Sequence, residues 1–502
     1  MPDLPNIRLL RSALSGELDQ DVQTFKTIFN SPQNEDIIFR RFQAAGFSMC
    51  LIYLEGMASA NQIADFILRA TMESDGRIPE SSGQGVQFLM ENVLNIPQAS
   101  AWETVEKLVE GILGGMSALL VDGCREACLL ETRGFEKRSV GKTQSESVVS
   151  GSQEGFVESL RTNITLLRRY VQSPQLITEK SAVGTKVRKD IALLYLTGVV
   201  REKSLEEIRR RIQKIQSASV QSLGQLQQHI EDCPFAILPQ MMLTERPDRA
   251  ASCLLDGQIV ILMDNSPCAL VAPATVFHLL HASDDNFQRW QYGTFLRLIR
   301  FIGILFSAFL PGFYVAVTLF HPHLIPTALL TAIAESRSNV PFTILTEVLI
   351  MEISYDLINE ASMRIPSQIG SAIGIVGGLI LGQAAVSASI ISPIVIIVIA
   401  LTGLGNFVIP NYGFTIGVMI YRLILIFAGA LMGLYGLVLA TFLILCHLCS
   451  MRSLGVPFLS PISPYRRHNP DIVLRFPVWL QKRLLFLARH KSWMHTEGDD
   501  EP

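Results

Sequence analysis

Residues 301–451 carry only eight charged side chains, and five of these fall within residues 347–364. A water-soluble domain must present charge to solvent, so a stretch this poor in charge is typical of a membrane domain. Carboxylates at membrane depth are costly unless they face water, a partner or an ion. The acidic segment at residues 341–363 is therefore the first candidate for a functional centre.

The N-terminal half has the opposite character. Residues 1–294 are rich in charge, and the chain opens without the apolar stretch of a secretory signal, so this half is predicted to remain in the cytoplasm. The tail after residue 451 is mostly basic, which predicts a cytoplasmic C-terminal end as well. Two cytoplasmic ends predict an even number of membrane crossings. Acids balance the bases of the soluble half, so nucleic acid is not an expected partner.

Four apolar segments are predicted to cross the membrane, namely residues 295–320, 369–391, 393–408 and 415–448. Residues 321–334 are interrupted by two prolines and are too short to span it. The pattern of residues 341–363 leaves open whether this acidic helix also crosses. Together the segments predict an all-α integral membrane domain at residues 291–450, followed by a cytoplasmic tail at residues 451–502.

The soluble half contains an internal repeat with an offset of 142 residues. Leu51-Ile-Tyr-Leu-Glu-Gly-Met57 matches Leu193-Leu-Tyr-Leu-Thr-Gly-Val199, and the same offset aligns Ala118-Leu-Leu-Val-Asp122 with Val260-Ile-Leu-Met-Asp264. In each copy an apolar strand is followed by a helix with apolar residues at spacings of three and four, and then by further strands.

These patterns predict an α/β soluble region of two repeated subdomains with mixed sheets, at residues 1–136 and 176–290. The segment between the copies is rich in Ser, Gly and charged residues. It predicts a linker at residues 137–175.

Within the acidic segment, Glu352, Asp356 and Glu360 recur every four residues, which stacks three carboxylates on one helix face. In a ring of subunits around water, such a column forms an acidic funnel that favours cations. A helix on the membrane surface, with its polar face among headgroups, explains the pattern as well. So do ion pairs with Arg337 and Arg364. The residues alone leave these alternatives open.

Two features of the neighbouring helices bear on packing. A glycine seam recurs every four residues and permits close approach of another helix, in the same subunit or in the next, at Gly370, Gly374, Gly378 and Gly382. Arg422 begins an uncharged run and is interpreted as an interfacial anchor rather than as a pore residue.

Catalysis is not expected. Gly141-Lys142-Thr143 resembles the end of a phosphate-binding loop, but Glu136 stands where the first glycine must be. The nine histidines show no ligand-like clustering, and the CxxC formed by Cys446 and Cys449 has no second ligand pair. The sequence therefore predicts no enzyme activity, no metal site and no cofactor.

A polar loop in the second copy lies close in sequence to the first membrane helix. It runs from Ile237-Leu-Pro-Gln240 to the group Thr244, Glu245, Arg246 and Asp248. Charged residues beside turns usually serve as local caps. A coupling element between the soluble and membrane parts is the functional alternative for this loop.

Several motifs, in order along residues 145–460, resemble the A subunit of the GerA-type spore germinant receptors of endospore-forming bacteria. They are Thr244-Glu-Arg-Pro-Asp248, Asn265-Ser-Pro267, Val340-Pro-Phe342, Leu349-Ile-Met-Glu352, Asn359-Glu-Ala361, Arg364-Ile-Pro366, Ile369-Gly-Ser-Ala-Ile-Gly-Ile-Val-Gly-Gly378, Gly382-Gln-Ala-Ala-Val386 and Gly455-Val-Pro457. Glu154-Gly-Phe-Val-Glu158, followed by Asn163 and Leu166-Leu-Arg168, resembles a linker motif of the family. One departure precedes it, because Ser150-Gly151-Ser152 stands where the family usually has Arg-Gly-Pro.

The resemblance implies a multisubunit receptor in the spore inner membrane, where a transporter-like B subunit senses the nutrient and a lipoprotein C subunit joins the two. It implies that the A subunit forms a homo-oligomer, a pentamer in contact with membrane lipid, which opens as a cation channel. In that channel Glu352, Asp356 and Glu360 would line the pore.

Other functions remain as alternatives. The stage V sporulation AF protein, a close paralogue, shares these motifs and would conduct without a nutrient subunit. A secondary transporter is the alternative from another class, but transporters have inverted repeats in the membrane, whereas this repeat is parallel and lies in the soluble half. A non-conducting membrane scaffold is the third.

Overall fold

The computed structural model describes residues 9–44, 46–73, 85–134, 146, 148, 151–364, 382–464, 474–477 and 479. These residues form two compact units. The α/β unit contains the described residues up to Glu231 together with Met241–Pro273. The helical unit contains Asp232–Gln240 and the described residues from Ala274 onward.

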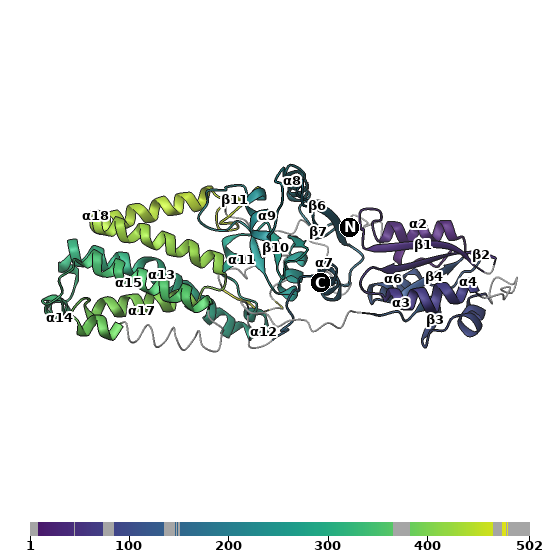
Figure 1. Ribbon diagram of the computed structural model, residues 1–502, viewed down its shortest axis with the longest axis horizontal. Helices are drawn as coiled ribbons and strands as arrows, with labels where there is room; N and C mark the ends of the chain where they lie inside the picture. The colour runs from purple at the N-terminus through teal and green to yellow at the C-terminus, as the bar shows by residue number, and fades with distance from the viewer. Residues whose placement is uncertain are drawn as a thin grey trace, which may run out of the picture. The chain divides into compact units, whose positions relative to one another are not determined.

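The first copy of the repeat is a five-stranded sheet with helices on both faces (Figure 1). Its strands are β1 (Ile37–Ala44), β2 (Phe47–Leu54), β3 (Ala99–Trp102), β4 (Ser117–Val121) and β5 (Ala127–Leu130), in the order β1-β2-β4-β5-β3. One face packs against α2 (Leu18–Ile28) and α6 (Val105–Leu113). The other packs against η1 (Ile63–Arg69), which is continuous with α3 (Ala60–Gln62) and α4 (Ala70–Glu73), and against α5 (Gly85–Phe88) and η2 (Leu89–Val93).

Strand β2 illustrates why the sequence of each copy contains long apolar runs. Cys50 and Ile52 pack into the core on the side of α2 and α6, while Met49 and Leu51 pack into the core on the other side. Successive side chains of a strand point to opposite faces. Because both faces are covered by helices, the buried run from Met49 to Ile52 is apolar at successive positions rather than at alternate ones.

The second copy has the same arrangement. Its strands are β6 (Leu176–Val183), β7 (Lys189–Leu196), β8 (Met242–Thr244), β9 (Ile259–Met263) and β10 (Ala269–Ala272), in the order β6-β7-β9-β10-β8, and its helices are α7 (Leu160–Tyr170), α8 (Glu202–Gln213), α9 (Leu223–Ile230) and α10 (Pro247–Leu255). The equivalence extends to single hydrogen bonds. Asp122 accepts one from the N–H of Leu18 at 3.1 Å, and Asp264, 142 positions later, accepts one from the N–H of Leu160 at 3.3 Å. The predicted repeat is thus confirmed.

Two details differ from the expectation. The strand pairs that the structure describes in both five-stranded sheets are antiparallel, so the prediction of mixed sheets is wrong. Tight hairpins join β1 to β2 and β4 to β5, and a hairpin forces antiparallel pairing. Helix α7 lies inside the segment 137–175 but packs on β7 and β9, so the second copy starts before residue 176.

A buried arginine joins the two copies. The guanidinium of Arg168, on α7, donates to both carboxylate oxygens of Asp36 at 2.7 and 2.8 Å and to the Asn34 amide oxygen at 3.0 Å. The backbone completes the junction, because the N–H of Thr178 donates to Asn34 and the N–H of Glu35 donates to the carbonyl of Thr178. Arg168 and Asp36 are each only 2% exposed. This bidentate ion pair fixes the orientation of the two copies as well as the contact between them.

The helical unit starts with the short helices α11 (Val276–Leu280) and α12 (Asp284–Phe287). It continues with α13 (Trp290–Phe320), η3 (Pro322–Leu324), α14 (Thr327–Arg337), α15 (Ile344–Arg364), α17 (Pro393–Phe407) and α18 (Tyr412–Ser450), and the strands β11 (Arg452–Ser453) and β12 (Val456–Pro457) follow. Helices α15, α17 and α18 all pack against α13, which is therefore central. The hydrophobic core of the helical unit includes Tyr314 from α13, Val348 from α15, Val395 from α17 and Ile426 from α18.

A compact ion cluster marks the start of α13. Asp285, on α12, accepts hydrogen bonds from Arg300 at 2.7 Å through both carboxylate oxygens and one from Arg297 at 3.3 Å. Burial acts to raise the pKa of Asp285, but the hydrogen bonds and positive charges of Arg300 and Arg297 outweigh it and hold that pKa below its usual value. One carboxylate thus binds both arginines where the long apolar helix begins.

Helix α18 is a hairpin of two limbs, residues 412–432 and 434–450. A straight helix of this length would place its ends about 58 Å apart. Instead both ends meet the loop 232–240: Gly413 lies against Pro239, and the N–H of Gly455, just beyond the helix, donates to Asp232 at 3.1 Å. The reversal occurs at Gly433, whose φ of 61° and ψ of −144° are not helical. Residues 415–448, predicted as one crossing, therefore belong to two antiparallel limbs (Figure 1).

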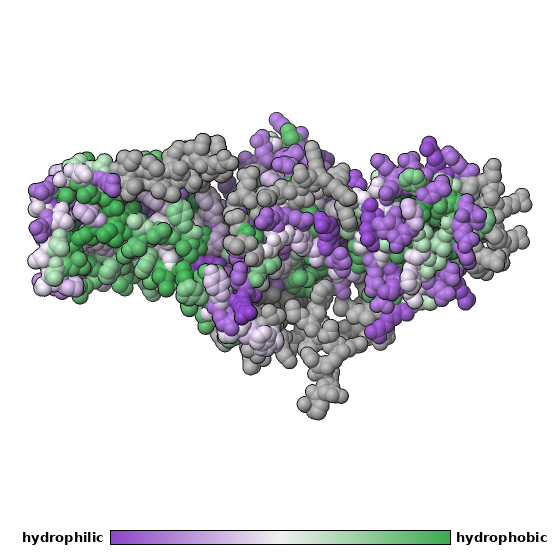
Figure 2. Space-filling view, turned by 90° about the horizontal axis from the view of Figure 1, so that it is seen from below, coloured by the Kyte–Doolittle hydropathy of each residue, from purple (hydrophilic) through white to green (hydrophobic). Residues whose placement is uncertain are grey.

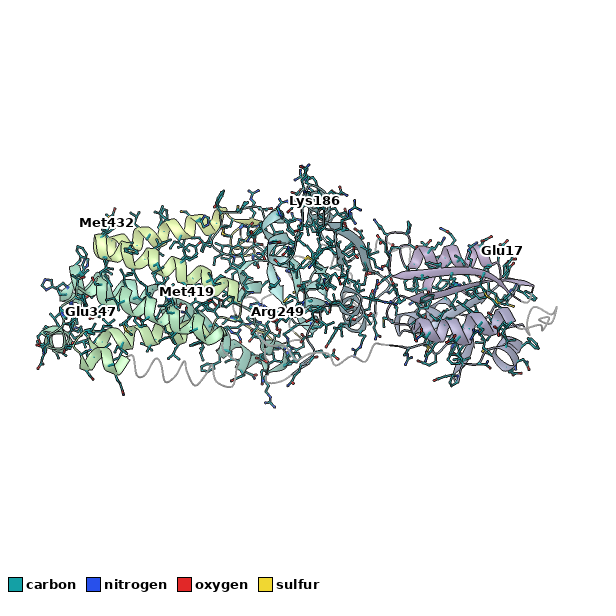
Figure 3. The ribbon with its side chains drawn as sticks, in the orientation of Figure 1. Glu17, Lys186, Arg249, Glu347, Met419 and Met432 are labelled. Carbon is teal, nitrogen blue, oxygen red and sulfur yellow. The ribbon has the colours of Figure 1, made fainter. Side chains whose placement is uncertain are left out.

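Figure 3 labels Met419 and Met432, which lie along the first limb and at its far end. Close helix approach is achieved by single glycines along this limb and α13. A Cβ added at Gly429 would lie 2.6 Å from the carbonyl oxygen of Gly312, and one at Gly312 would lie 2.9 Å from the backbone of Leu425. A Cβ at Gly405, on α17, would collide with the carbonyl of Gly303. Small residues permit such backbone contact where no other side chain would fit.

The outer face of the helical unit is apolar. Figure 2 shows hydrophobic residues dominating the helical unit on the face in view, whereas hydrophilic residues gather over the α/β copies. Exposed large apolar side chains occur along α13, α17 and both limbs of α18, and they include Ile302, Leu305, Phe313, Ile397, Leu404, Phe407, Leu431, Tyr435 and Phe442. Within the described part of the chain, α13 and α18 are the two helices long and apolar enough to cross a membrane.

Replacing Gly433 by Ala is expected to destabilise the helical unit by about 1–3 kcal/mol, because residues with side chains are nearly excluded from this backbone conformation. The new methyl group would also meet the Cβ of Phe320 at 2.9 Å. Thermal unfolding of the full chain in detergent measures the loss. Gly382→Ala is the control, because its methyl group would meet only Ile396 at 3.7 Å. Equal effects of the two changes would contradict the hairpin geometry.

Replacing Arg168 by Met is expected to lower the free energy of unfolding of the α/β unit by about 3–5 kcal/mol, because Asp36 would remain buried without its counter-charge. The double variant D36L/R168M removes both charges and is expected to recover most of that loss. Urea unfolding followed by circular dichroism measures both. A double variant as unstable as R168M would show that the ion pair itself, rather than the stranded carboxylate, carries the effect.

Candidate functional site

The acidic helix α15 lies inside the helical bundle with its polar side inward. Glu347 and Glu352 are 0% exposed, whereas Ile353 and Leu357 are 57% and 64% exposed. An interfacial helix has the reverse arrangement, with its charged side facing outward. The structure therefore disfavours the surface-helix alternative for this segment.

The first acid of the helix is held by two partners. Glu347 is fully buried and forms an ion pair with Arg337 of α14 at 3.0 Å, and it accepts the backbone N–H of Ser392 at 3.1 Å. Figure 3 labels Glu347 at the end of the bundle that α14 caps. Arg337 thus pairs with an acid outside the predicted column, whereas Glu352 and Asp356 lie beside Arg422.

The three acids of the predicted column differ in their surroundings. Glu352 is fully buried and lies 2.9 Å from Nη2 of Arg422. Asp356, one turn later, lies 3.4 Å from the same nitrogen, and its side chain is 31% exposed. Glu360, at the next turn, is exposed. The column thus runs from the interior of the bundle to its surface.

The position of Arg422 corrects its interpretation as an interfacial anchor. Its side chain is 0% exposed and reaches across from the first limb of α18 to α15. The nearby carboxylates of Glu352 and Asp356 explain why a guanidinium can lie in this nonpolar interior. The signal missed in the sequence is the coincidence of one isolated arginine and one acid column among uncharged helices.

A polar layer adjoins this ion pair. The hydroxyl of Ser307, on α13, donates to the side-chain oxygen of Asn406, on α17, and both residues are buried. The ring of Tyr355, between the acids on α15, packs so closely on α17 that a Cβ at Gly403 would lie 2.7 Å from it. Side chains from four helices thus bring polar groups to one level of the bundle.

Only one glycine of the predicted seam, Gly382, belongs to the residues that the structure describes. Gly370, Gly374 and Gly378 lie outside the described residues, so their role in packing stays a prediction. Gly382 is described, and a Cβ there would make ordinary contact with Ile396 of α17. The close helix crossings described above instead use Gly303, Gly312, Gly405 and Gly429, which lie outside the predicted seam.

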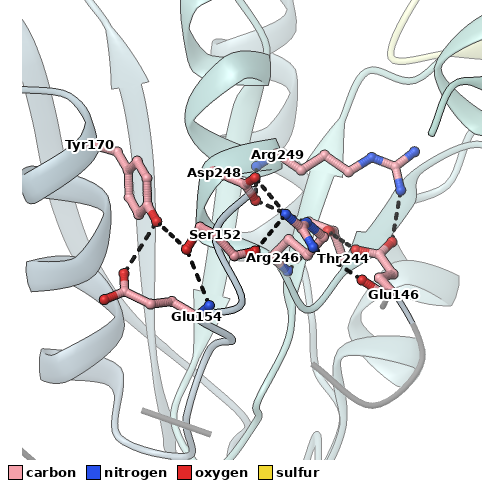
Figure 4. Close-up of polar contacts among 8 residues, drawn as sticks. All are labelled: Glu146, Ser152, Glu154, Tyr170, Thr244, Arg246, Asp248 and Arg249. Atoms are coloured by element: carbon pink, nitrogen blue, oxygen red, sulfur yellow. Dashed lines mark hydrogen bonds and ion pairs between the residues drawn. The ribbon is translucent and has the colours of Figure 1, made fainter. Parts of the chain in front are cut away.

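The loop after β8 forms a dense polar cluster with the segment that links the two copies (Figure 4). Arg246 is almost fully buried and donates to both carboxylate oxygens of Asp248 at 3.0 and 2.7 Å. It also donates to the backbone carbonyls of Glu146 at 3.2 Å and Ser152 at 2.9 Å. The Glu146 carboxylate in turn accepts from Thr244 at 2.6 Å and from Arg249 at 2.7 Å.

This cluster is specific to the second copy. The carbonyl of Glu245 accepts the N–H of Phe156, and in the first copy the carbonyl of Glu103 accepts the N–H of Leu14 in the same way. Glu245 therefore contributes to the shared architecture. Arg246 does not, because the equivalent residue of the first copy is Thr104.

Ser152, which departs from the family pattern, takes part in this cluster. Its hydroxyl accepts hydrogen bonds from Tyr170 at 2.9 Å and from the N–H of Glu154 at 3.2 Å. Burial raises the pKa of the Tyr170 phenol, and the nearby Glu154 carboxylate acts in the same direction. A proline at position 152 would lack this hydroxyl, so the contact belongs to this chain. Sequence reasoning gave no signal for Glu146, a lone acid in a polar linker.

A second part of the predicted loop lies in the helical unit. Leu238 packs directly on Gly417 of the first limb, where a Cβ would collide with it. The carbonyl of Gln240 accepts the hydroxyl of Ser453, and that hydroxyl in turn accepts the N–H of Ala274 at 3.1 Å. Loop 232–240 thus holds both ends of the α18 hairpin.

Metal chemistry finds no support in the described part of the chain. No group of three or more His, Cys, Asp or Glu side chains comes together there as potential ligands. Cys446 and Cys449 are exposed on the second limb of α18.

Replacing Arg246 by Lys is expected to loosen the linker, because an ammonium group cannot bond two carboxylate oxygens and two carbonyls at once. A loss of about 2 kcal/mol corresponds to roughly 30-fold faster proteolysis near residues 146–154. Limited proteolysis of the full chain measures the rate. Arg210→Lys is the control, since Arg210 is exposed and pairs with Glu207 alone. Unchanged cleavage in R246K would show that the cluster does not hold the linker.

Comparison with known proteins places the chain in one family. The profile described as "Bacillus/Clostridium GerA spore germination protein" matches residues 23–484. Spore germination protein KA of Bacillus subtilis (strain 168) is 36% identical over 454 residues, which cover 90% of this chain and 83% of that protein. Spore germination protein GerLA of Bacillus cereus is 32% identical over 453 residues, which cover 90% of this chain and 91% of that protein.

Among solved structures, the crystal structure of the N-terminal domain of the A subunit of the Bacillus megaterium spore germinant receptor GerK3 is similar, with a TM-score of 0.41 and 26% sequence identity. The match covers 53% of this chain and 97% of that domain. The family profile extends over most of the described residues, in both units. The chain belongs to the GerA family of spore germination proteins, the A subunits of germinant receptors.

Proposed function

We propose that this chain is the ion-conducting A subunit of a nutrient germinant receptor and that it releases monovalent cations across the spore inner membrane. Glu352, Asp356 and Glu360 line the cation path in this proposal. The observation that carries it is the course of these acids, which leave the bundle interior and reach the surface of an otherwise apolar helical unit. Acidic side chains tolerated in such a setting are explained by water and cations passing them.

The proposed setting is an integral membrane domain with its α/β copies and tail in the cytoplasm. The lengths and composition of α13 and α18 support it, as do the exposed apolar side chains along these helices. The hairpin of α18 contributes a passage in each direction, so it adds two crossings to those of the other helices. Membrane lipid covers the apolar face in this arrangement.

The partners follow from the family. A homo-oligomer, a pentamer, surrounds the cation path, and each A subunit works with a transporter-like B subunit that senses the nutrient and with a lipoprotein C subunit. Apolar side chains beside the acids on α15, such as Ile353 and Leu357, are available for contact with neighbouring subunits. The glycine seam Gly370, Gly374, Gly378 and Gly382 packs the pore helices in this proposal.

We further propose that Thr244, Glu245, Arg246 and Asp248 couple the α/β copies to the helices. Arg246 holds the linker between the copies, and β8 connects this cluster along the chain to loop 232–240. That loop packs on Gly417 and is bonded beyond the other end of the α18 hairpin. A change in the linker therefore reaches α18 through one short piece of backbone.

Neutralising the column with E352Q/D356N/E360Q is expected to lower the permeability for potassium over chloride by about tenfold, because each carboxylate attracts cations at close range. Reversal potentials of the full chain reconstituted in planar bilayers measure this ratio. E335Q is the matched control, since Glu335 is an exposed acid on the neighbouring helix α14. A triple variant with the selectivity of the wild type would remove these acids from the path.

A further inference from the structure

Arg422 distinguishes the three acids of the proposed cation path. One nitrogen, Nη2, lies 2.9 Å from Glu352 and 3.4 Å from Asp356, so a single guanidinium serves two carboxylates. Arg422 and Glu352 are completely buried, whereas the Asp356 side chain is partly exposed. Glu360 lies one helical turn further along, at the exposed end of the column.

The charges of this group do not cancel. Two carboxylates and one guanidinium leave one negative charge, and the guanidinium stays positive at any accessible pH. Glu352 is the partner that permits Arg422 to be buried, because an unpaired arginine in this interior would be strongly unfavourable. The contact with Asp356 is not required for the burial of Arg422. It weakens the attraction of this partly exposed carboxylate for a passing cation.

The position of Arg422 on its helix adds a mechanical connection. It lies on the first limb of α18, little more than one helical turn after Gly417, where Leu238 of loop 232–240 packs. Glu352 and Asp356 lie on a different helix, α15. A displacement of the limb relative to α15 therefore acts directly on the distances from Arg422 to both acids.

We propose that Arg422 is a positioning residue that regulates the cation path, and this rests on the function proposed above. It ties α15 to the first limb of α18 and withholds the charges of Glu352 and Asp356 from cations. The arrangement described here is then the non-conducting one. Conduction requires the guanidinium to release Asp356, which it holds more loosely, while Glu352 remains its partner.

The test uses the full chain reconstituted in potassium-loaded liposomes, with efflux measured in the absence of any stimulus. E352Q/R422Q removes the buried pair without leaving a stranded charge, and it frees Asp356. It is expected to raise the efflux about tenfold, because the partly exposed Asp356 keeps its charge and no longer has a guanidinium 3.4 Å away. Adding D356N is expected to return the efflux to the wild-type level, because the freed carboxylate is then absent. R422K, which keeps the charge, is expected to stay close to the wild type.

A matched control separates regulation from loss of packing. R337Q/E347Q removes the other buried pair of α15, which does not touch the column. Thermal unfolding in detergent shows whether each variant is folded, and the control is expected to leave efflux unchanged at a comparable loss of stability. Efflux that rises equally in the control would reduce Arg422 to a structural role and overturn the proposal.

Two further outcomes are distinguishable. If the wild type conducts but E352Q/R422Q gives the same unstimulated efflux, or if D356N makes no difference in that background, this inference is overturned while the channel function stands. If liposomes show no potassium efflux with the wild type or with any of the variants, with and without the companion subunits, both the proposed function and this inference are overturned.

Discussion

A guanidinium removed from water needs a carboxylate or carbonyl oxygen beside it, and contacts of this kind lie where parts of the chain meet. The three largest fully buried side chains among the described residues are Arg168, Arg246 and Arg422. Arg168 joins the two copies, Arg246 joins the linker to the second copy, and Arg422 joins α15 to α18. Apolar surfaces tolerate sliding, whereas the directional bonds of an arginine specify one arrangement. Each of these three arginine contacts is therefore expected to be either formed or lost, without intermediate arrangements.

The repeat shows how much of the fold is encoded locally. Apolar runs at an offset of 142 residues sufficed to predict two copies of one α/β subdomain, because strands covered on both faces are apolar throughout. The direction of strand pairing could not be predicted in this way. It depends on which strands become neighbours, and apolar runs of this kind carry no signal for that. Helix α7 was missed as part of the second copy because its polar residues, such as Arg168, serve a junction between the copies.

The helical unit shows the opposite balance. Its poverty in charge and its acidic helix were evident from the sequence, but the pairing of Glu352 with Arg422 joins residues 70 positions apart and leaves no periodic trace. The reversal at Gly433 was hidden because this glycine sits in an unbroken apolar run. The length of that run was the available clue, since it exceeds what one passage through a bilayer requires. Individual side chains, rather than patterns, decided these features.

The turn at Gly433 has a consequence for access to the molecule. The two limbs of α18 are joined at Gly433 with no intervening loop, so helical backbone runs up to the turn from both sides. An epitope or fluorescent tag inserted there would have to unwind helix. A partner that acts on the hairpin must therefore contact its sides through the neighbouring helices or act at its opposite end, which is in contact with loop 232–240. The turn of α18 therefore offers no loop to a binding partner, whereas the opposite end of the hairpin is held by loop 232–240.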